Sequence, residues 1–127
     1  IEELKKIISN KTKFICVCHT SNIVASINNL HEITKIAHER NIKVVGDGVA
    51  YMAHDLADLK NIDVDFYSFS LYKTYGPHLA LLYGKKELLQ KTKNLNQEFL
   101  SAEVPYTLNP GGPNHEELAC LSGLTDY

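Results

Sequence analysis

Lys73 and the stretch around it offer the first sign of chemistry in the sequence. The lysine lies in "SFSLYKTYGP" (residues 68–77), directly after an apolar stretch and before a Gly-Pro turn. Lysine is seldom buried unless it is paired or reactive, and this position predicts a half-buried amine. Such an amine can form an imine with an aldehyde once its pKa falls. An ordinary exposed loop lysine is the alternative.

Asp47 and Ser70 also follow apolar, strand-like stretches. Asp47 comes after "KVVG" and before Gly48. A carboxylate at the end of a buried strand needs a cation or a hydrogen-bond donor. A protonated ring nitrogen would satisfy it and would let that ring accept electrons from a substrate carbanion. The alternative is an aspartate that caps the next turn. The Ser70 hydroxyl could bind a phosphate oxygen or only satisfy the strand end.

Hydrophobic periodicity predicts the elements that must position these groups. Strands are expected at 13–18, 42–48, 64–70 and 79–84, and helices at 1–9, 29–40, 55–61, 85–92 and 114–124. Asn29 with Glu32, and Asn114, provide helix N-caps, and Asn41 a helix stop. Residues 94–110, with Pro105 and Pro110, are expected to form loop.

Strands that alternate with helices predict a three-layer α/β fold with a mainly parallel sheet and flanking helices. Continuous apolar strands are typical of a sheet covered on both faces. The strand at 79–84 follows 64–70 without a helix, so the sequence leaves open that it runs antiparallel. Ligands of such sheets bind at the carboxyl ends of the strands. There we expect His19, Thr20, Ser21 and Asn22, then Asp47, Ser70 and Lys73.

Composition narrows the classes of partner. The net charge is −2 and the lysines are scattered, which argues against nucleic acid. The apolar stretches are too short to span a bilayer, and no metal-ligand spacing is present. An odd count of three cysteines without a secretory signal indicates a reducing compartment, and a cytoplasmic location is expected. Cys16 and Cys18 share one strand face and are expected to be small buried residues.

Three stretches together resemble the class V aminotransferase and cysteine desulfurase group of fold-type I pyridoxal-phosphate enzymes. They are "CHTSNIVASIN", "VVGDGVAYMAHDLADLKNIDVDFYSFS" and "LYKTYGPHLALLYGKKELL". The resemblance covers about residues 12–92, resumes at "NPGGPNHEELACLSG", and looks closest to the cysteine-desulfurase-like branch. It implies that residues 1–127 are part of the large cofactor-binding domain, whose amino-terminal part and small carboxy-terminal domain are absent from this sequence.

The resemblance also implies pyridoxal 5'-phosphate as cofactor and a role for each matching residue. Lys73 would form the Schiff base and later move the α-proton. The remaining cofactor contacts would be Asp47 to the pyridinium nitrogen, Asn22 to the ring hydroxyl, Ser70 and Tyr72 to the phosphate, and Gly112 to the phosphate of the partner subunit's cofactor. His19 and His54 match the family motif, with structural roles expected. The implied partners are an amino-acid substrate and a second copy of the chain, as a homodimer.

Several positions depart from the family pattern. Ala50 stands where many relatives have Gln or His, Tyr72 where desulfurases have His, and Gly112 where a threonine follows the glycine. None of the three cysteines lies in a context that resembles the desulfurase nucleophile. Desulfuration, transamination, elimination and epimerisation at the α-carbon all stay open.

Two other classes of protein fit part of the sequence. A signalling receiver domain also sets an Asp and a Lys at strand ends, but it needs an acidic pair after the first strand to hold Mg²⁺, and this chain has His19, Thr20 and Ser21 there. A non-catalytic relative or truncated fragment would keep the fold and bind the cofactor weakly, as Ala50 and Gly112 suggest.

Overall fold

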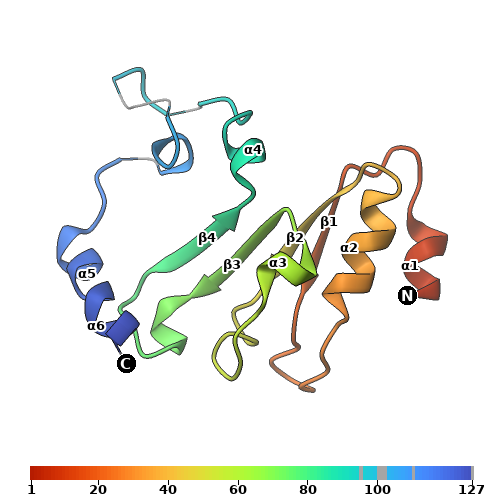
Figure 1. The fold of residues 1–127 in the computed structure, drawn as a ribbon, viewed down its shortest axis with the longest axis horizontal. Coiled ribbons are helices and arrows are strands. Elements are labelled where there is room, and N and C mark those ends of the chain that lie inside the picture. The colour runs from red at the N-terminus through yellow and green to blue at the C-terminus, as the bar shows by residue number, and fades with distance from the viewer. Residues whose placement is uncertain (95, 100–102, 110, 127) are drawn as a thin grey trace.

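The computed structural model describes residues 1–94, 96–99, 103–109 and 111–126 of the 127-residue chain. Within these residues, four strands form one sheet, and helices lie before, between and after them (Figure 1). The strands are β1 (Phe14–Cys18), β2 (Lys43–Asp47), β3 (Phe66–Ser70) and β4 (Ala80–Gly84). The helices are α1 (Glu2–Ile7), α2 (Leu30–His38), α3 (Leu59–Ile62), α4 (Lys86–Leu89), α5 (His115–Ala119) and α6 (Leu121–Asp126). Short 3-10 turns occupy Leu71–Lys73 and Tyr106–Leu108.

The sheet has the order β1-β2-β3-β4. β1, β2 and β3 are parallel, and β4 runs antiparallel to β3, which confirms the α/β class and the mainly parallel sheet. Cys18 lies opposite Asp47, and Asp47 lies opposite Ser68. The carboxyl ends of the three parallel strands therefore meet at one edge of the sheet.

The helix α2 begins and ends where the sequence predicts. The Asn29 side chain accepts a hydrogen bond from the Glu32 backbone N–H at 3.1 Å and so caps the first turn. Asn41 lies just beyond the helix with a φ of 56°, a left-handed conformation that asparagine adopts more readily than most residues. Between these points α2 presents an apolar face to the sheet.

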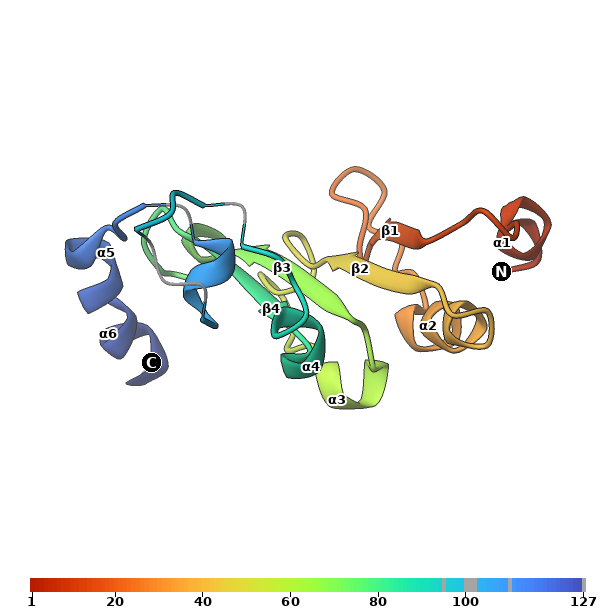
Figure 2. The same ribbon diagram turned by 90° about the horizontal axis from the view of Figure 1, so that it is seen from above.

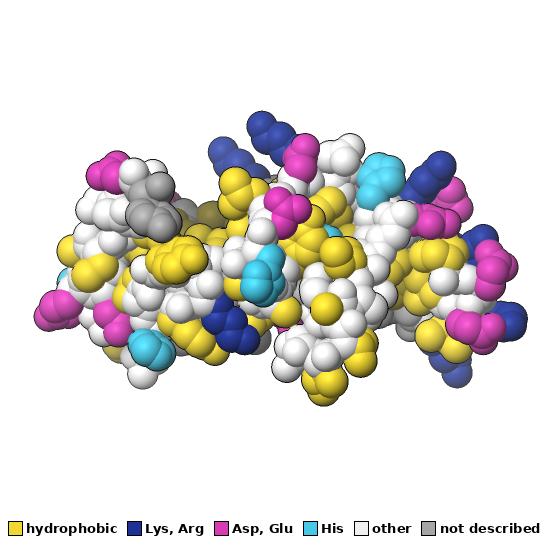
Figure 3. Space-filling view, turned by 90° about the horizontal axis from the view of Figure 1, so that it is seen from below, with side chains coloured by type: hydrophobic (Ala, Val, Ile, Leu, Met, Phe, Trp, Pro, Cys, Tyr) yellow, Lys and Arg dark blue, Asp and Glu magenta, His cyan; other side chains and the backbone are white. Residues whose placement is uncertain are grey.

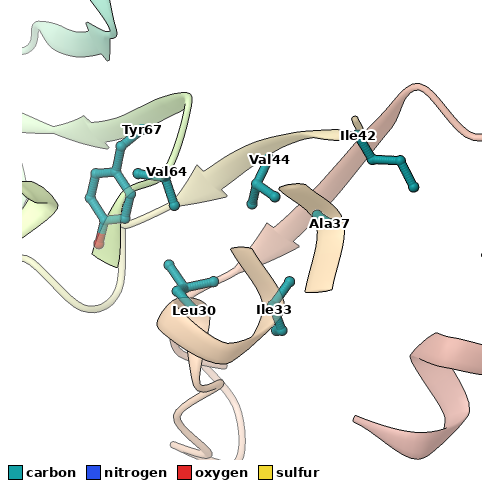
Figure 4. Packing of buried hydrophobic residues seen from close by; sticks show 7 residues of the cluster. All are labelled: Leu30, Ile33, Ala37, Ile42, Val44, Val64 and Tyr67. Carbon is teal, nitrogen blue, oxygen red and sulfur yellow. The ribbon is translucent and has the colours of Figure 1, made fainter. Parts of the chain in front are cut away.

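The main hydrophobic core lies between this face of α2 and one face of the sheet (Figure 4). Figure 2 shows α2 and α3 on the same side of the sheet. Side chains from the helix, from the strands and from the connection between them fill this layer. The buried cluster consists of Leu30, Ile33, Ala37, Ile42, Val44, Val64 and Tyr67.

The expectation that both faces of the sheet are covered is wrong for the described residues. Phe14 on β1 is 56% exposed and Leu82 on β4 is 50% exposed. The prediction that Cys16 and Cys18 are buried fails for the same reason, because both thiols are exposed on this open face. They do share one face of β1, as the period of two requires.

The final helical segment also differs from the prediction. In place of one helix over 114–124, α5 ends at Ala119 and α6 begins at Leu121. The predicted cap is present, since the Asn114 side chain accepts from the Glu117 backbone N–H at 3.1 Å. The 3-10 turn at Tyr106–Leu108 interrupts the predicted loop, and Pro110 lies outside the described residues.

Asp65 is a buried acid at the opposite, amino-terminal edge of the sheet. Its carboxylate accepts from the Val44 backbone N–H at 2.8 Å and lies 2.9 Å from His38 Nε2 and 3.2 Å from Lys43 Nζ. Burial by itself raises the pKa of Asp65, but the bonds from His38, Val44 and Lys43 outweigh it and hold the pKa below its ordinary value. This carboxylate ties α2, β2 and β3 together.

Tyr67 fixes the backbone on which Asp47 stands. Its ring is fully buried, and it packs against Gly46 and Gly48 so closely that an added Cβ would lie 2.6 Å and 2.2 Å from ring atoms. The two glycines thus leave room for the ring on the helix-covered face. Asp47, between them, points to the open face, because successive strand residues alternate.

We predict that Gly48→Ala destabilises the protein, because the methyl group would overlap the Tyr67 ring. Overpacking of this kind costs about 1–3 kcal/mol, and the midpoint of thermal unfolding should fall. Gly123→Ala in α6 is the matched control, since an added Cβ meets nothing within 4 Å there and alanine favours a helix. Equal midpoints for the two variants would contradict this account of the Tyr67 packing.

Candidate functional site

The candidate site lies at the edge where β1, β2 and β3 end. Figure 3 views the molecule from below, with hydrophobic side chains reaching the surface over much of its length. The exposed apolar residues include Ile23, Val24 and Ile27 after β1 and Tyr72 and Tyr75 after β3. Such exposure near polar strand ends is typical of a surface that binds a ligand or another chain.

Asp47 is the last residue of β2, and its side chain is exposed. One carboxylate oxygen, Oδ1, accepts from the Val49 backbone N–H at 2.9 Å, which is the turn cap that the sequence left open as an alternative. The other oxygen, Oδ2, lies 3.6 Å from Cys18 Sγ. The carboxylate is therefore oriented by two donors while its outer side stays accessible.

Ser70 is the last residue of β3 and lies two residues beyond Ser68, the partner of Asp47. By alternation, Ser68, Ser70 and Asp47 belong to the same open face of the sheet. Ser70 is half-buried. The structure therefore brings the acid and the hydroxyl to one face of one edge, as predicted.

Lys73 ends the 3-10 turn that follows β3. Leu71, the first residue of the turn, is buried. Its carbonyl accepts hydrogen bonds from the backbone N–H groups of Thr74 and Gly76 at 2.9 and 2.8 Å. Lys73 is exposed among the described residues, so the prediction of a half-buried amine is wrong. The turn leaves the carboxyl end of β3 directly, and no described element covers the side chain.

Tyr72 is 48% exposed and its ring stacks on His78, with centroids 5.1 Å apart and an angle of 9° between planes. Lys73 Nζ lies 5.8 Å from the centre of the Tyr72 ring. This distance falls within the range of cation–π contacts. The Tyr72 phenol ring thus lies near both the Lys73 amine and the His78 imidazole.

Asn22 and Gly112 are less closely tied to this group. Asn22 is exposed in the turn after β1, at the same edge of the sheet. Gly112 precedes α5 by two residues, is exposed, and has nothing within 4 Å of the place where a Cβ would lie. The structure brings Asn22 to the site edge and shows no contact between Gly112 and that edge.

His19, which the sequence assigns a structural role, is buried behind the site. Its Nδ1 lies 2.8 Å from the Tyr67 hydroxyl, and its ring stacks on Tyr51 at 3.6 Å between centroids. Burial lowers the pKa of His19, against a smaller opposing effect of the Asp55 charge. Burial also raises the pKa of Tyr67, so both groups are neutral near pH 7. His54 is exposed, and its backbone N–H donates to the Tyr51 carbonyl at 2.9 Å.

Sequence reasoning missed two features of this site. The contact between Cys18 and Asp47 follows from their place as the last residues of paired strands, and counting back from the two strand ends could have found it. The packing of Tyr67 against Gly46 and Gly48 has a weaker signal in the sequence. That signal is an aromatic residue in one predicted strand and two closely spaced glycines at the end of the preceding strand.

The polar groups at this edge of the sheet suit an aromatic aldehyde cofactor that carries a phosphate. The accessible carboxylate of Asp47, the Ser70 hydroxyl and the Lys73 amine stand at the ends of two adjacent strands. In residues 1–94, 96–99, 103–109 and 111–126, no group of three or more His, Cys, Asp or Glu side chains is arranged to hold a metal ion. Within the same ranges, no helix is both long and apolar enough to cross a bilayer.

Comparison with known families decides the broader assignment. The profile of the family described as "Aminotransferase class-V" matches residues 1–121. The chain belongs to the aminotransferase class-V family. This membership confirms the resemblance drawn from the three sequence stretches, and it makes the receiver-domain alternative wrong.

Relatives and solved structures place the chain near the cysteine desulfurases of this family. An aminotransferase-like protein of Gibberella zeae is 41% identical over 99 residues, which cover 77% of this chain and 25% of that protein. A cysteine desulfurase of Dickeya dadantii is 32% identical over 138 residues, covering 98% of this chain and 34% of that protein. The crystal structure of the cysteine desulfurase CsdA from Escherichia coli matches with a TM-score of 0.83 and 29% identity, over 99% of this chain and 36% of that one. The chain thus spans between a quarter and about a third of the length of these relatives.

We predict that the buried His19 makes stability depend on pH. Its pKa in the folded protein lies below the ordinary value of 6.5, so the unfolded chain takes up the proton first as the pH falls. The stabilisation is complete above pH 6.5 and is lost below it, with a slope of at most about 1.4 kcal/mol per pH unit for one proton.

The measurement is the free energy of unfolding between pH 7.5 and 5 for the wild type and for His19→Asn. The variant should show a flatter dependence in this range, since the titrating ring is gone. Identical slopes would show that His19 is not the group responsible.

Proposed function

We propose that this chain forms part of the large cofactor-binding domain of a pyridoxal-phosphate enzyme that acts at the α-carbon of an amino acid. The observation that carries the proposal is the placement of Asp47, Ser70 and Lys73 at the carboxyl ends of β2 and β3. Ligands of open α/β sheets bind at this edge. The similarity to cysteine desulfurases over 98–99% of the chain supports the same reading.

Each residue of the site has a physical task in this proposal. The Lys73 amine would hold the cofactor aldehyde, and it would move the proton to and from the α-carbon of the substrate. The Asp47 carboxylate would pair with the protonated ring nitrogen, and the Ser70 hydroxyl would donate to a phosphate oxygen. When bound, the cofactor supplies an electron sink for the carbanion formed at the α-carbon.

The remaining predicted contacts complete the cofactor site. The Asn22 amide would donate to the ring hydroxyl oxygen, and the Tyr72 hydroxyl would reach the phosphate. Gly112 can offer only its backbone N–H to an anion, since the hydroxyl expected at this position is missing. The exposed apolar side chains of Ile23 and Val24, next to Asn22, suit a homodimer in which the site lies near the second copy.

The reaction outcome is proposed at the level of the class. Desulfuration of cysteine or a closely related lyase reaction is favoured by the desulfurase relatives, and transamination is the other candidate. A cytoplasmic location agrees with the three free thiols of Cys16, Cys18 and Cys120. The alternative, a relative that binds the cofactor weakly, is favoured by the exposure of Lys73 and by the glycine at 112.

We predict that borohydride reduction of the full-length protein with pyridoxal phosphate attaches the cofactor to Lys73. Peptide mass spectrometry should find the modification there, and Lys73→Ala should lose it together with the visible absorbance. Lys86→Ala is the matched control, because Lys86 is exposed on α4, next to the amino-terminal end of β3 and away from the site.

A wild type that stays colourless, with Lys73 no more modified than Lys86, would overturn the proposed function. Modification of Lys73 only at cofactor concentrations that also modify Lys86 would favour the weakly binding relative.

A further inference from the structure

Cys18 and Asp47 form a side-chain pair that the proposed roles do not use. They are direct partners across β1 and β2. The thiol Sγ lies 3.6 Å from Asp47 Oδ2, within hydrogen-bond range for sulfur, while Oδ1 is occupied by the Val49 N–H at 2.9 Å. Each oxygen of the carboxylate therefore has its own donor: the Val49 N–H donates to Oδ1, and the thiol donates to Oδ2.

The backbone on both sides of this pair is held firmly. The Cys18 carbonyl accepts from Asn28 Nδ2 at 2.8 Å. The Asp47 carbonyl accepts from the His19 N–H at 2.7 Å, and His19 is itself buried against Tyr67. With both main chains fixed, the sheet holds the two Cα atoms opposite each other. The side-chain torsions of Cys18 and Asp47 then set the distance between thiol and carboxylate.

The thiol acts as the donor in this contact. The negative charge of Asp47 raises the pKa of the Cys18 thiol, with smaller effects of desolvation and of the hydrogen bond itself. The group therefore keeps its proton near pH 7, and an S–H can donate to a carboxylate. A thiolate in this place would instead repel Asp47.

We propose that Cys18 is a positioning residue for Asp47, holding Oδ2 so that the carboxylate keeps the orientation in which it pairs with a protonated ring nitrogen. The inference rests on the proposed function, since the ring nitrogen belongs to the proposed cofactor. Cys18 touches neither the cofactor nor the substrate in this account. It acts through Asp47, and its loss leaves Oδ1 bonded to the Val49 N–H but leaves Oδ2 without its donor.

The first experiment needs no cofactor and uses iodoacetamide on the full-length protein. The alkylation rate of Cys18 is measured as a function of pH, and the midpoint of this profile is the readout. Because only the thiolate reacts, the midpoint reports the thiol pKa and does not depend on how accessible the thiol is. Asp47→Asn should move the midpoint to lower pH by removing the charge. Cys16 lies on the same face opposite Val45, and its profile should not respond. An unchanged Cys18 midpoint would overturn the inference.

The second experiment measures pyridoxal-phosphate affinity and the apparent pKa of the visible absorbance of the lysine-bound cofactor. Cys18→Ala should weaken binding by about threefold to tenfold, the effect of one modest hydrogen bond, and should shift that apparent pKa. Cys18→Ser restores a donor and should stay within about twofold of the wild type. Cys16→Ala should match the wild type in both measurements.

The two proposals fail in different ways. If borohydride labels Lys73 and all cysteine variants behave alike, the role of Cys18 is wrong and the proposed function stands. If Lys73 of the wild type is not labelled, the proposed function is wrong. The role of Cys18 in cofactor pairing is then wrong as well.

Discussion

The packing of Tyr67 against two glycines determines where the acid of the candidate site stands. The ring occupies the space next to Gly46 and Gly48 on the helix-covered face, and the strand alternation then places Asp47 on the other face. The Tyr67 hydroxyl is hydrogen-bonded to His19 Nδ1, and the His19 backbone N–H donates to the Asp47 carbonyl. One buried aromatic side chain therefore links the hydrophobic core to the polar edge of the sheet.

A second polar contact, made by Asp65 at the opposite edge of the sheet, holds α2 against the sheet. Asp65 connects β3 to β2 through the Val44 N–H and to α2 through His38. A buried carboxylate is costly unless it is paired. Here His38 and the Val44 N–H contact Oδ2, and Lys43 forms an ion pair with Oδ1. The core between the two edges is apolar. The site edge can then carry exposed groups, because the buried contacts of Tyr67 and His19 hold its backbone.

Much of the fold could be predicted from local patterns. The apolar strands, the caps at Asn29 and Asn114 and the stop at Asn41 are properties of a few neighbouring residues, and all occur where expected. The positions of Asp47 and Ser70 follow from the rule that parallel strands end at one edge. The antiparallel β4 was left open, because only its pairing with β3 decides it.

Burial was harder to predict, because it depends on what covers each face. Cys16 and Cys18 lie in an apolar strand that has a helix on one side only, so their thiols are exposed. Lys73 lies two residues after the buried Leu71, yet its own side chain is exposed. The link between Cys18 and Asp47 joins residues 29 positions apart, and only the strand register brings them together.

A crystal structure of the full-length protein with pyridoxal phosphate would examine the central assignment directly. We expect the ring nitrogen to lie within hydrogen-bond distance of Asp47 Oδ2, the aldehyde carbon to be bonded to Lys73 Nζ, and the phosphate to lie near Ser70. A cofactor bound elsewhere, or bound with Asp47 turned away from the ring nitrogen, would contradict it.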